Sequence, residues 1–297
     1  MNRRNLIKNS TLAAGIAMTT NPFASRLEAA EAALGVGLKG RINHSTCRWC
    51  YDSIPFEDLC KAAKEIGLQS IELTGTEEWP ILKKYGLTCA MGWGKYPEKM
   101  GLNNFFNKVK NHDALVGFYE DLIPKAANAG VNNVICFSGN RDGIDDYQGL
   151  LNCQKGLQRI MKTAEKYKVT VSMELLNSKV DHNDYQCDRT QWGVVLAEMI
   201  GSERFKLLYD VYHMQIMEGD VIATIKKYHP YISHYHTGGV PGRHEIDETQ
   251  ELNYPAIMKA IIDTGYKGFV GQEFIPTPKD ATGKLASLKQ GVLICDV

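Results

Sequence analysis

The chain has 297 residues, and its 34 lysines and arginines balance 34 aspartates and glutamates. This length suits one large α/β domain and is sufficient to bury a core without cross-links. The zero net charge offers no basic surplus for nucleic acid, so no nucleic-acid partner is expected. Beyond the N-terminus, no apolar run approaches the roughly 18 residues of a membrane span. No membrane span is therefore expected once the N-terminal export signal, described next, has been removed.

The N-terminus reads as an export signal. Arg3 and Arg4 open a twin-arginine pattern, a mildly apolar stretch runs from Ser10 to Thr20, and small residues near Ala30 offer cleavage sites. The stretch is too short and too weakly apolar to cross a bilayer. We therefore predict that residues 1–32 are a twin-arginine-type signal and tether, and that the mature protein is periplasmic. The alternative is a basic N-terminal arm.

The eight cysteines do not suggest a disulfide scaffold in a chain of this length. Cys47 and Cys50 are the one suggestive pair, and no second pair at similar spacing completes a zinc site. They could form a local disulfide or remain two free thiols. Cys89 and Cys136 lie in apolar runs and are expected to be buried.

Short apolar runs alternate with helical patterns at intervals of about 30 residues, which is typical of repeated βα units. The predicted strands are Arg41–Ser45, Gln69–Leu73, Thr88–Gly92, Asn133–Phe137, Thr170–Leu175, Lys206–Tyr209, Ile232–His236 and Gly268–Glu273. The predicted helices include Pro55–Ala63, His112–Ala129, Asp145–Tyr167 and Ala256–Ile262. Eight strands with interleaved helices predict a single (β/α)8 TIM barrel over residues 40–297.

The main rival fold is an open, doubly wound sheet. That fold usually carries a glycine-rich turn after its first strand, and His44–Arg48 offers none. The glycine-rich segment Gly238–Gly242 instead follows the seventh predicted strand, where it is expected to form a long active-site loop.

Four consecutive predicted strands end in ionisable residues: Glu174, Asp210, His236 and Glu273. The C-terminal ends of barrel strands converge on one mouth, where barrel enzymes place their chemistry. Three carboxylates brought together would repel one another unless a cation lies among them. The oxygen-rich set with one imidazole predicts one divalent metal ion, with Mn²⁺ favoured and Mg²⁺ or Co²⁺ as alternatives.

Other polar and aromatic residues of the strands have two interpretations each. His234 is two residues before His236, so both side chains point to the same face of the strand, but His234 lies one layer deeper in the barrel. It is therefore expected to be a hydrogen-bonded core residue. His44 and Glu72 could line the pocket or cap a helix. Trp93, with Trp49 and Trp79, could form a stacking wall for a sugar ring or pack in the core.

Three segments carry a resemblance to a known family: Leu208–Asp220, Gly239–Glu245 and Tyr266–Phe274. They resemble the hydroxypyruvate isomerase family, which belongs to the wider group of xylose-isomerase-like barrels together with ketose 3-epimerases. The resemblance covers the chain from about Arg41 to its C-terminus, and its motifs are specific only in the second half.

The resemblance implies roles for individual residues. It implies that Glu174, Asp210, His236 and Glu273 hold the metal, and that Glu174 and Glu273 double as acid/base groups. It also implies that His213 and Arg243 bind substrate oxygens. The full set of substrate-binding candidates is His213, Arg243, Glu245, His44 and Trp93.

The chain departs from both groups of relatives. Hydroxypyruvate isomerases carry glutamine at the position of His236, whereas the ketose epimerases carry histidine. The epimerases also have a second substrate-binding glutamate shortly after the first metal ligand, and the segment Asn177–Asp181 contains no glutamate.

The expected activity is that of a metal-dependent isomerase or epimerase. It would abstract a proton α to the carbonyl of a small sugar or keto acid through a metal-stabilised enediolate. One alternative is a β-eliminating lyase acting on 3-keto sugars or 3-keto-glycosides, which the export signal favours. Another is a non-catalytic periplasmic sugar-binding barrel, which would not need two acids flanking its ligand. A homo-oligomer is compatible with the sequence.

Overall fold

The structure is a computed structural model that describes residues 37–297. The predicted export signal lies outside the described residues. Among the residues that are described, no helix combines the length and the apolar character needed to cross a membrane.

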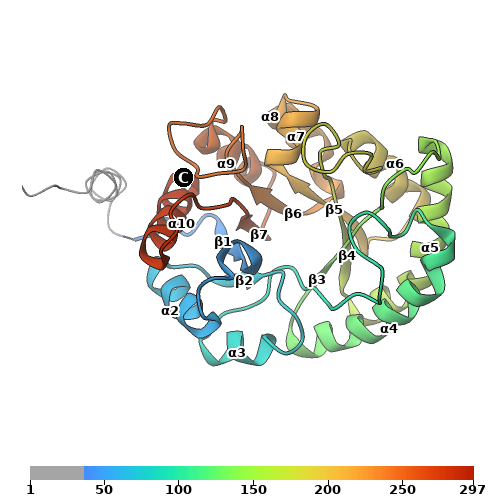
Figure 1. The fold of residues 1–297 in the computed structure, drawn as a ribbon, viewed down its shortest axis with the longest axis horizontal. Helices are drawn as coiled ribbons and strands as arrows, with labels where there is room; N and C mark the ends of the chain where they lie inside the picture. Colours follow the sequence, from blue (N-terminus) through green and yellow to red (C-terminus); the bar gives the residue numbers. More distant parts are fainter. Residues whose placement is uncertain (1–36) are drawn as a thin grey trace, which may run out of the picture. The chain divides into compact units, whose positions relative to one another are not determined.

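Seven strands form one parallel sheet in the order β2-β1-β7-β6-β5-β4-β3 (Figure 1). Their bounds are β1 Asn43–Cys47, β2 Ser70–Glu72, β3 Asn133–Cys136, β4 Thr170–Glu174, β5 Phe205–Asp210, β6 Ile232–Thr237 and β7 Phe269–Gln272. Each lies within about two residues of a predicted strand at either end. The parallel order and the intervening helices are those expected of repeated βα units.

The predicted strand over residues 88–92 is not continuous, and this corrects the expectation of eight regular strands. It makes isolated parallel bridges, from Thr88 to Ser70 on β2 and from Gly92 to Val134 on β3. Between these bridges, the backbone of Ala90 forms hydrogen bonds with side chains and not with a neighbouring backbone. Its N–H donates to Ser70 Oγ at 2.8 Å, and its carbonyl accepts from the side-chain amide of Asn133. The segment still joins β2 to β3, so the barrel closes.

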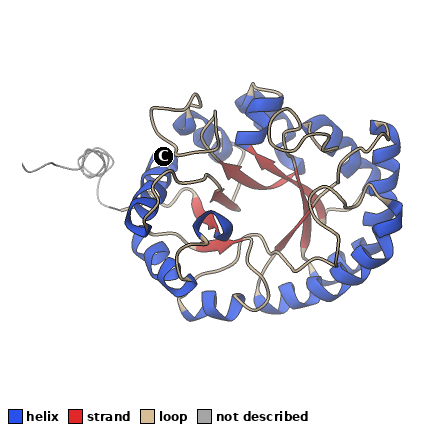
Figure 2. Ribbon diagram, viewed as in Figure 1, coloured by secondary structure: helices blue, strands red, loops and turns tan. Residues whose placement is uncertain are grey.

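Helices surround the strands on the outside of the barrel (Figure 2). The α-helices are α2 Phe56–Ile66, α3 Trp79–Lys84, α4 His112–Ala129, α5 Asp146–Tyr167, α6 Thr190–Ile200, α7 Val211–Met217, α8 Val221–Tyr228, α9 Tyr254–Asp263 and α10 Ala281–Cys295. Three 3₁₀ turns accompany them: η1 Arg48–Tyr51, η2 Val109–Asn111 and η3 His229–Tyr231.

The ends of the helices follow the sequence signals. Helix α2 stops at Gly67, whose φ of +99° is a left-handed conformation that glycine adopts without strain. Helix α5 starts after Asp145, whose side chain accepts a hydrogen bond from the backbone N–H of Gln148 at 2.7 Å. Helices α2 and α5 each begin one residue after their predicted starts, and α2 ends three residues beyond the predicted Ala63.

The strands are buried along almost their whole length, as parallel strands covered by helices must be. All eight cysteines are buried and free, so Cys47 and Cys50 are two thiols and not a disulfide. Charged side chains inside such a barrel need specific partners, and several of the buried ones lie at the C-terminal ends of β4 to β7.

Candidate active site

The four strand-end residues meet at one mouth of the barrel. Glu174 ends β4, Asp210 ends β5, His236 lies one residue before the end of β6, and Glu273 follows β7 directly. These strands are neighbours in the sheet, and the side chains offer ligand atoms that all lie within 4.8 Å of one another. The structure thus brings together the whole predicted metal quartet, and each member is buried.

His236 is oriented by a carboxylate behind it. Its Nε2 lies 2.6 Å from Glu72 Oε1, whereas its Nδ1 points into the quartet, 2.8 Å from Glu273 Oε2 and 3.4 Å from Glu174 Oε1. A proton on Nε2 that is donated to Glu72 leaves the lone pair on Nδ1 facing the quartet. This carboxylate–histidine arrangement is the usual way in which proteins fix the tautomer of a metal ligand.

Glu72 is fully buried and neither lines the cavity nor caps a helix, the two roles that the sequence had suggested. The same Oε1 atom accepts from His234 Nε2 at 2.7 Å, so His234 is a hydrogen-bonded core residue as expected. Although burial opposes ionisation, the charge and hydrogen bonds of His234 and His236 lower the pKa of Glu72 to about 2. Glu72 is therefore a buried anion beneath the quartet.

Asp210 has two structural partners besides the quartet. It is the N-cap of α7, where its Oδ1 accepts from the backbone N–H of His213 at 3.2 Å. Its Oδ2 lies 3.5 Å from Arg243 Nη2. These contacts hold the carboxylate at the end of β5 in a fixed orientation.

Glu273 is held by donors on both oxygens. Trp49 Nε1 donates to Oε1 at 2.8 Å, and Arg243 Nη2 donates to Oε2 at 2.7 Å. The Arg243 guanidinium also lies 5.3 Å from the Trp49 ring and 5.5 Å from the Tyr212 ring. Sequence reasoning proposed Trp49 only as a stacking or core residue, because nothing in a linear pattern reveals this indole–carboxylate bond.

The two glutamates of the quartet are placed in different electrostatic environments. Burial and the nearby charge of Glu273 raise the pKa of Glu174. Burial would also raise the pKa of Glu273, but His236 and Arg243 outweigh it and hold the pKa well below its usual value. Burial raises the pKa of Asp210 to about 8, even though Arg243 opposes the shift.

The quartet has the features of a cation site. Among the described residues, the buried atoms Glu174 Oε1 and His236 Nδ1 make no hydrogen bond, and they face each other across the cluster. Burial opposes the charged form of His236, but Glu273 and Cys47 raise its pKa well above the usual value, so the ring must release its Nδ1 proton to bind an ion. Three carboxylates and an imidazole nitrogen freed in this way are a donor set for a divalent ion such as Mn²⁺, Mg²⁺ or Co²⁺. These four residues could hold one such ion.

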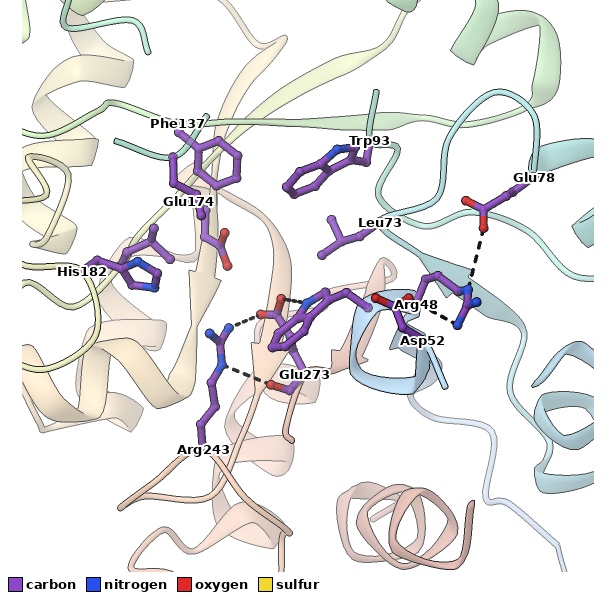
Figure 3. A pocket seen from close by; sticks show the side chains of 13 residues that line it. Arg48, Asp52, Leu73, Glu78, Trp93, Phe137, Glu174, His182, Arg243 and Glu273 are labelled. Atoms are coloured by element: carbon purple, nitrogen blue, oxygen red, sulfur yellow. Dashed lines mark hydrogen bonds and ion pairs between the residues drawn. The ribbon is translucent and has the colours of Figure 1, made fainter. Parts of the chain in front are cut away.

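A cavity of about 550 Å³ opens beside Glu174 and Glu273 (Figure 3). Its charged and polar lining consists of Arg48, Asp52, Glu78, Glu174, His182, Arg243 and Glu273. Its apolar lining consists of Trp49, Leu73, Trp93, Leu102, Phe137 and Leu176. This volume is in the range of sites that enclose small organic molecules.

The cavity separates the predicted substrate-binding residues into two groups. Trp93 and Arg243 line it, as expected of residues that contact a substrate. His213 lies behind the quartet, fully buried, with Nδ1 2.7 Å from the side-chain nitrogen of Asn177. Burial and the charge of Arg243 hold the pKa of His213 well below its usual value, so it is a neutral ring.

The structure does not bring His44 and Glu245 to the cavity. His44 Nε2 lies 3.3 Å from Asp296 Oδ1, and both side chains are buried. Glu245 Oε1 accepts from the backbone N–H of Thr277 at 2.7 Å and from Ser287 Oγ at 3.0 Å. Their partners come from the C-terminal segment, so both residues tie that segment to the barrel.

His182 lines the cavity, and sequence reasoning missed it. Its Nε2 atom is buried and has no hydrogen-bond partner among the described residues. Its ring lies 5.3 Å from the His213 ring in an edge-on arrangement. The loop after β4 carries it to the cavity, and no periodic pattern marks such a loop residue.

Comparisons with known proteins agree with this architecture. The xylose isomerase-like TIM-barrel family matches residues 60–291. The chain is 36% identical to the 2-oxo-tetronate isomerase of Cupriavidus necator over 115 residues, which are 39% of this chain and 44% of that protein. It is 32% identical to the hydroxypyruvate isomerase of Escherichia coli over 112 residues, which are 37% of this chain and 43% of that protein. The chain thus spans less than half the length of each of these two relatives.

Among solved structures, the fold is similar to that of an AP endonuclease of family 2 from Brucella melitensis. The TM-score is 0.73 at 23% sequence identity, and the match covers 82% of this chain and 96% of that chain. At this identity the likeness concerns the fold, a closed barrel of parallel strands and outer helices.

Proposed function

The chain belongs to the xylose isomerase-like TIM-barrel family, and from this premise we propose that it is an isomerase or epimerase. It would move a proton on the carbon next to the carbonyl of a small sugar or keto acid. The observation that carries the proposal is the pair Glu174 and Glu273, which come from β4 and from the end of β7 and face the same cavity. The names of the two curated relatives support it, because both are isomerases.

The proposed cofactor is one divalent metal ion, Mn²⁺ in the first instance, held by Glu174, Asp210, His236 and Glu273. The donor set and the unpartnered buried atoms of the quartet support this assignment. When bound, such an ion supplies a Lewis acid that stabilises the negative charge developing on a carbonyl oxygen in an enediolate-like transition state.

The two glutamates are suited to different parts of a proton transfer. Glu174 Oε1 has no donor in the described structure, and the pKa of this carboxyl is raised, so it accepts a proton more readily. Glu273 is held by Trp49 and Arg243 and stays ionised. Pairs of acids whose pKa values are pushed apart are a frequent feature of acid/base sites. We assign abstraction of the proton and its return to Glu174, and we assign positioning to Glu273.

The test is solvent exchange in D₂O with the Mn²⁺-loaded protein. Turnover should place deuterium on the carbon next to the carbonyl, and Glu174→Gln should slow it by about 10²–10⁴-fold while retaining metal. Glu57→Gln, which removes an exposed carboxylate bonded to Lys84, should leave the rate unchanged. Turnover without any deuterium in product or recovered substrate would contradict the mechanism.

The comparisons give no support to the lyase or to the binding-only alternative.

A further inference from the structure

The loop after β4 places His182 at the cavity and anchors it there. Its backbone N–H donates to the carbonyl of Asn177 at 3.1 Å, and its own carbonyl accepts from the backbone N–H of Tyr185 at 3.0 Å. The hydroxyl of Tyr185 in turn donates to the carbonyl of Glu174, the last residue of β4, at 3.1 Å. His182 is therefore tied to the end of the strand that carries Glu174.

The ring of His182 has a nitrogen that no other described residue uses. Its Nε2 atom is buried and has no hydrogen-bond partner among the described residues, although the side chain lines the cavity (Figure 3). A buried ring nitrogen with a purely structural role is normally hydrogen-bonded, as His234 Nε2 is to Glu72. An occupant of the cavity is the partner that remains for His182 Nε2.

The imidazole of His182 is neutral in this position. Burial and the positive charge of Arg243 lower its pKa, and they outweigh the opposing charges of Asp181 and Glu273. The His213 ring, which lies edge-on to it with a centroid distance of 5.3 Å, is also neutral. A neutral imidazole can donate to one oxygen atom and accept from another, and a lowered pKa suits it to polarise a carbonyl as an uncharged donor.

Two described residues that line the cavity have a buried side-chain atom without a hydrogen-bond partner: Glu174 at Oε1 and His182 at Nε2. Moving a carbonyl to the neighbouring carbon requires the transfer of two protons, one between the carbons and one between the oxygens. Glu174 is assigned to the first of these protons. The second requires a neutral group that both donates and accepts, and His182 Nε2 has this chemistry.

We propose that His182 is a catalytic residue that moves the hydroxyl proton of the substrate, so that the reaction is an isomerisation. Glu174 removes the proton from the carbon next to the carbonyl, and the C–H electron pair becomes the double bond of an enediolate. His182 Nε2 gives its proton to the former carbonyl oxygen and takes the proton of the neighbouring hydroxyl. Glu174 then returns its proton to the former carbonyl carbon, and the neighbouring oxygen becomes the new carbonyl. The imidazole ends in the state in which it began.

This inference rests on the proposed function and narrows it from an isomerase or epimerase to an isomerase. An epimerase leaves the carbonyl in place and returns the carbon proton on the opposite face, so it has no hydroxyl proton to move. Glu273 would be the acid on that opposite face, but Trp49 and Arg243 already donate to its two oxygens.

The first test separates the two protons by comparing His182→Gln with the wild type, both as the Mn²⁺-loaded full chain in D₂O. Hydroxypyruvate and D-fructose are the probes. Two rates are measured: deuterium uptake at the carbon next to the carbonyl, and formation of the product in which the carbonyl has moved. Glutamine cannot carry the proton between oxygens, so product formation should fall by about 10²–10⁴-fold. Deuterium uptake should fall by about tenfold at most, because the amide still donates a hydrogen bond to the carbonyl oxygen.

His229→Gln is the matched control. His229 also has a buried ring nitrogen without a partner among the described residues, but it lies in η3 and does not line the cavity. This variant should leave both rates unchanged. An equal loss of both rates in His182→Gln, or a loss of neither, overturns this inference. Weaker Mn²⁺ binding by His182→Gln in equilibrium dialysis also overturns it, because that result would show a structural role.

The second test follows the products of the wild-type protein by NMR with the same two probes. D-fructose should give an aldose with deuterium on its second carbon, and hydroxypyruvate should give an aldehyde. A ketose inverted at its third carbon without any aldose overturns this inference and leaves the proposed function standing, as does deuterium uptake without an aldehyde product. No deuterium uptake with either probe overturns the proposed function and this inference with it.

Discussion

Glu72 is a carboxylate with no exposure to solvent, and it orients another residue of the candidate site. Its Oε1 accepts from both His234 and His236, and only the second of these belongs to the candidate metal site. The bond to His236 holds that ring so that its Nδ1 faces the quartet. A carboxylate outside the quartet thus orients His236, and in the proposed metal site it would determine whether this ligand is available.

We expect Glu72→Gln to weaken Mn²⁺ binding by about 10- to 100-fold, because loss of the charge weakens the bond that orients His236. Equilibrium dialysis against Mn²⁺ measures this directly and does not depend on activity. Glu57→Gln provides the matched control, since it removes an exposed glutamate charge. Unchanged Mn²⁺ affinity in Glu72→Gln, with the fold intact by circular dichroism, would show that His236 needs no such support.

Asp210 combines ligation with helix capping, so its two roles must be separated. Asp210→Ala should lose most bound divalent metal and activity, and should also destabilise the fold by about 1 kcal/mol through loss of the α7 cap. Asp210→Asn keeps a good capping side chain and should lose metal with a smaller change in stability. Elemental analysis and thermal unfolding of both variants decide the matter. A full complement of metal in Asp210→Ala would mean that the quartet is wrongly assigned.

At the scale of secondary-structure elements, β7 makes room for the charged cluster beneath the site. A Cβ atom on Gly271 would lie 2.7 Å from Glu72 Oε1, which is closer than such atoms approach. The absence of a side chain at this point of β7 therefore allows the carboxylate of β2 to reach across to β6. Close packing in barrel interiors makes such small residues part of the site.

The substitution Gly271→Ala should displace Glu72 and lower both Mn²⁺ affinity and stability, because the buried carboxylate would lose its two histidine partners. Gly117→Ala is the matched control in α4, where an added Cβ meets no atom within 4 Å. It should stabilise the protein by about 0.5–1 kcal/mol, because alanine is the better helix former. Chemical denaturation of both variants measures the difference, and equal stability would refute the packing argument.

At the scale of the whole molecule, the export of the chain is a separate prediction from its chemistry. The twin-arginine pattern at Arg3 and Arg4 leads us to propose that the protein is periplasmic, with the mature chain starting between about Ser25 and Gly37. Changing both arginines to lysine should retain the uncleaved form in the cytoplasm. N-terminal sequencing of fractionated protein tests this, and exported protein that still begins at Met1 would rule the signal out.

The barrel itself could be predicted from the sequence because its signals are local. These signals act between neighbouring residues: apolar runs of strand length, helix periodicity, and residues at helix ends such as Gly67 and Asp145.

The segment 88–92 could not be predicted in this way. Its sequence has the character of a strand, but the side chains of Ser70 and Asn133 replace part of the backbone ladder. Those partners lie on neighbouring strands, and no pattern within the segment indicates them.

The grouping of Glu174, Asp210, His236 and Glu273 could be predicted from the sequence, because parallel strands in a barrel all end at the same mouth. Which other residues join them depends on how distant segments pack together. Glu72 and His236 are 164 residues apart in the chain, as Trp49 and Glu273 are 224 apart, and such contacts follow from packing and not from local pattern. The same packing turns His44 and Glu245 toward the C-terminal segment and carries His182 to the cavity.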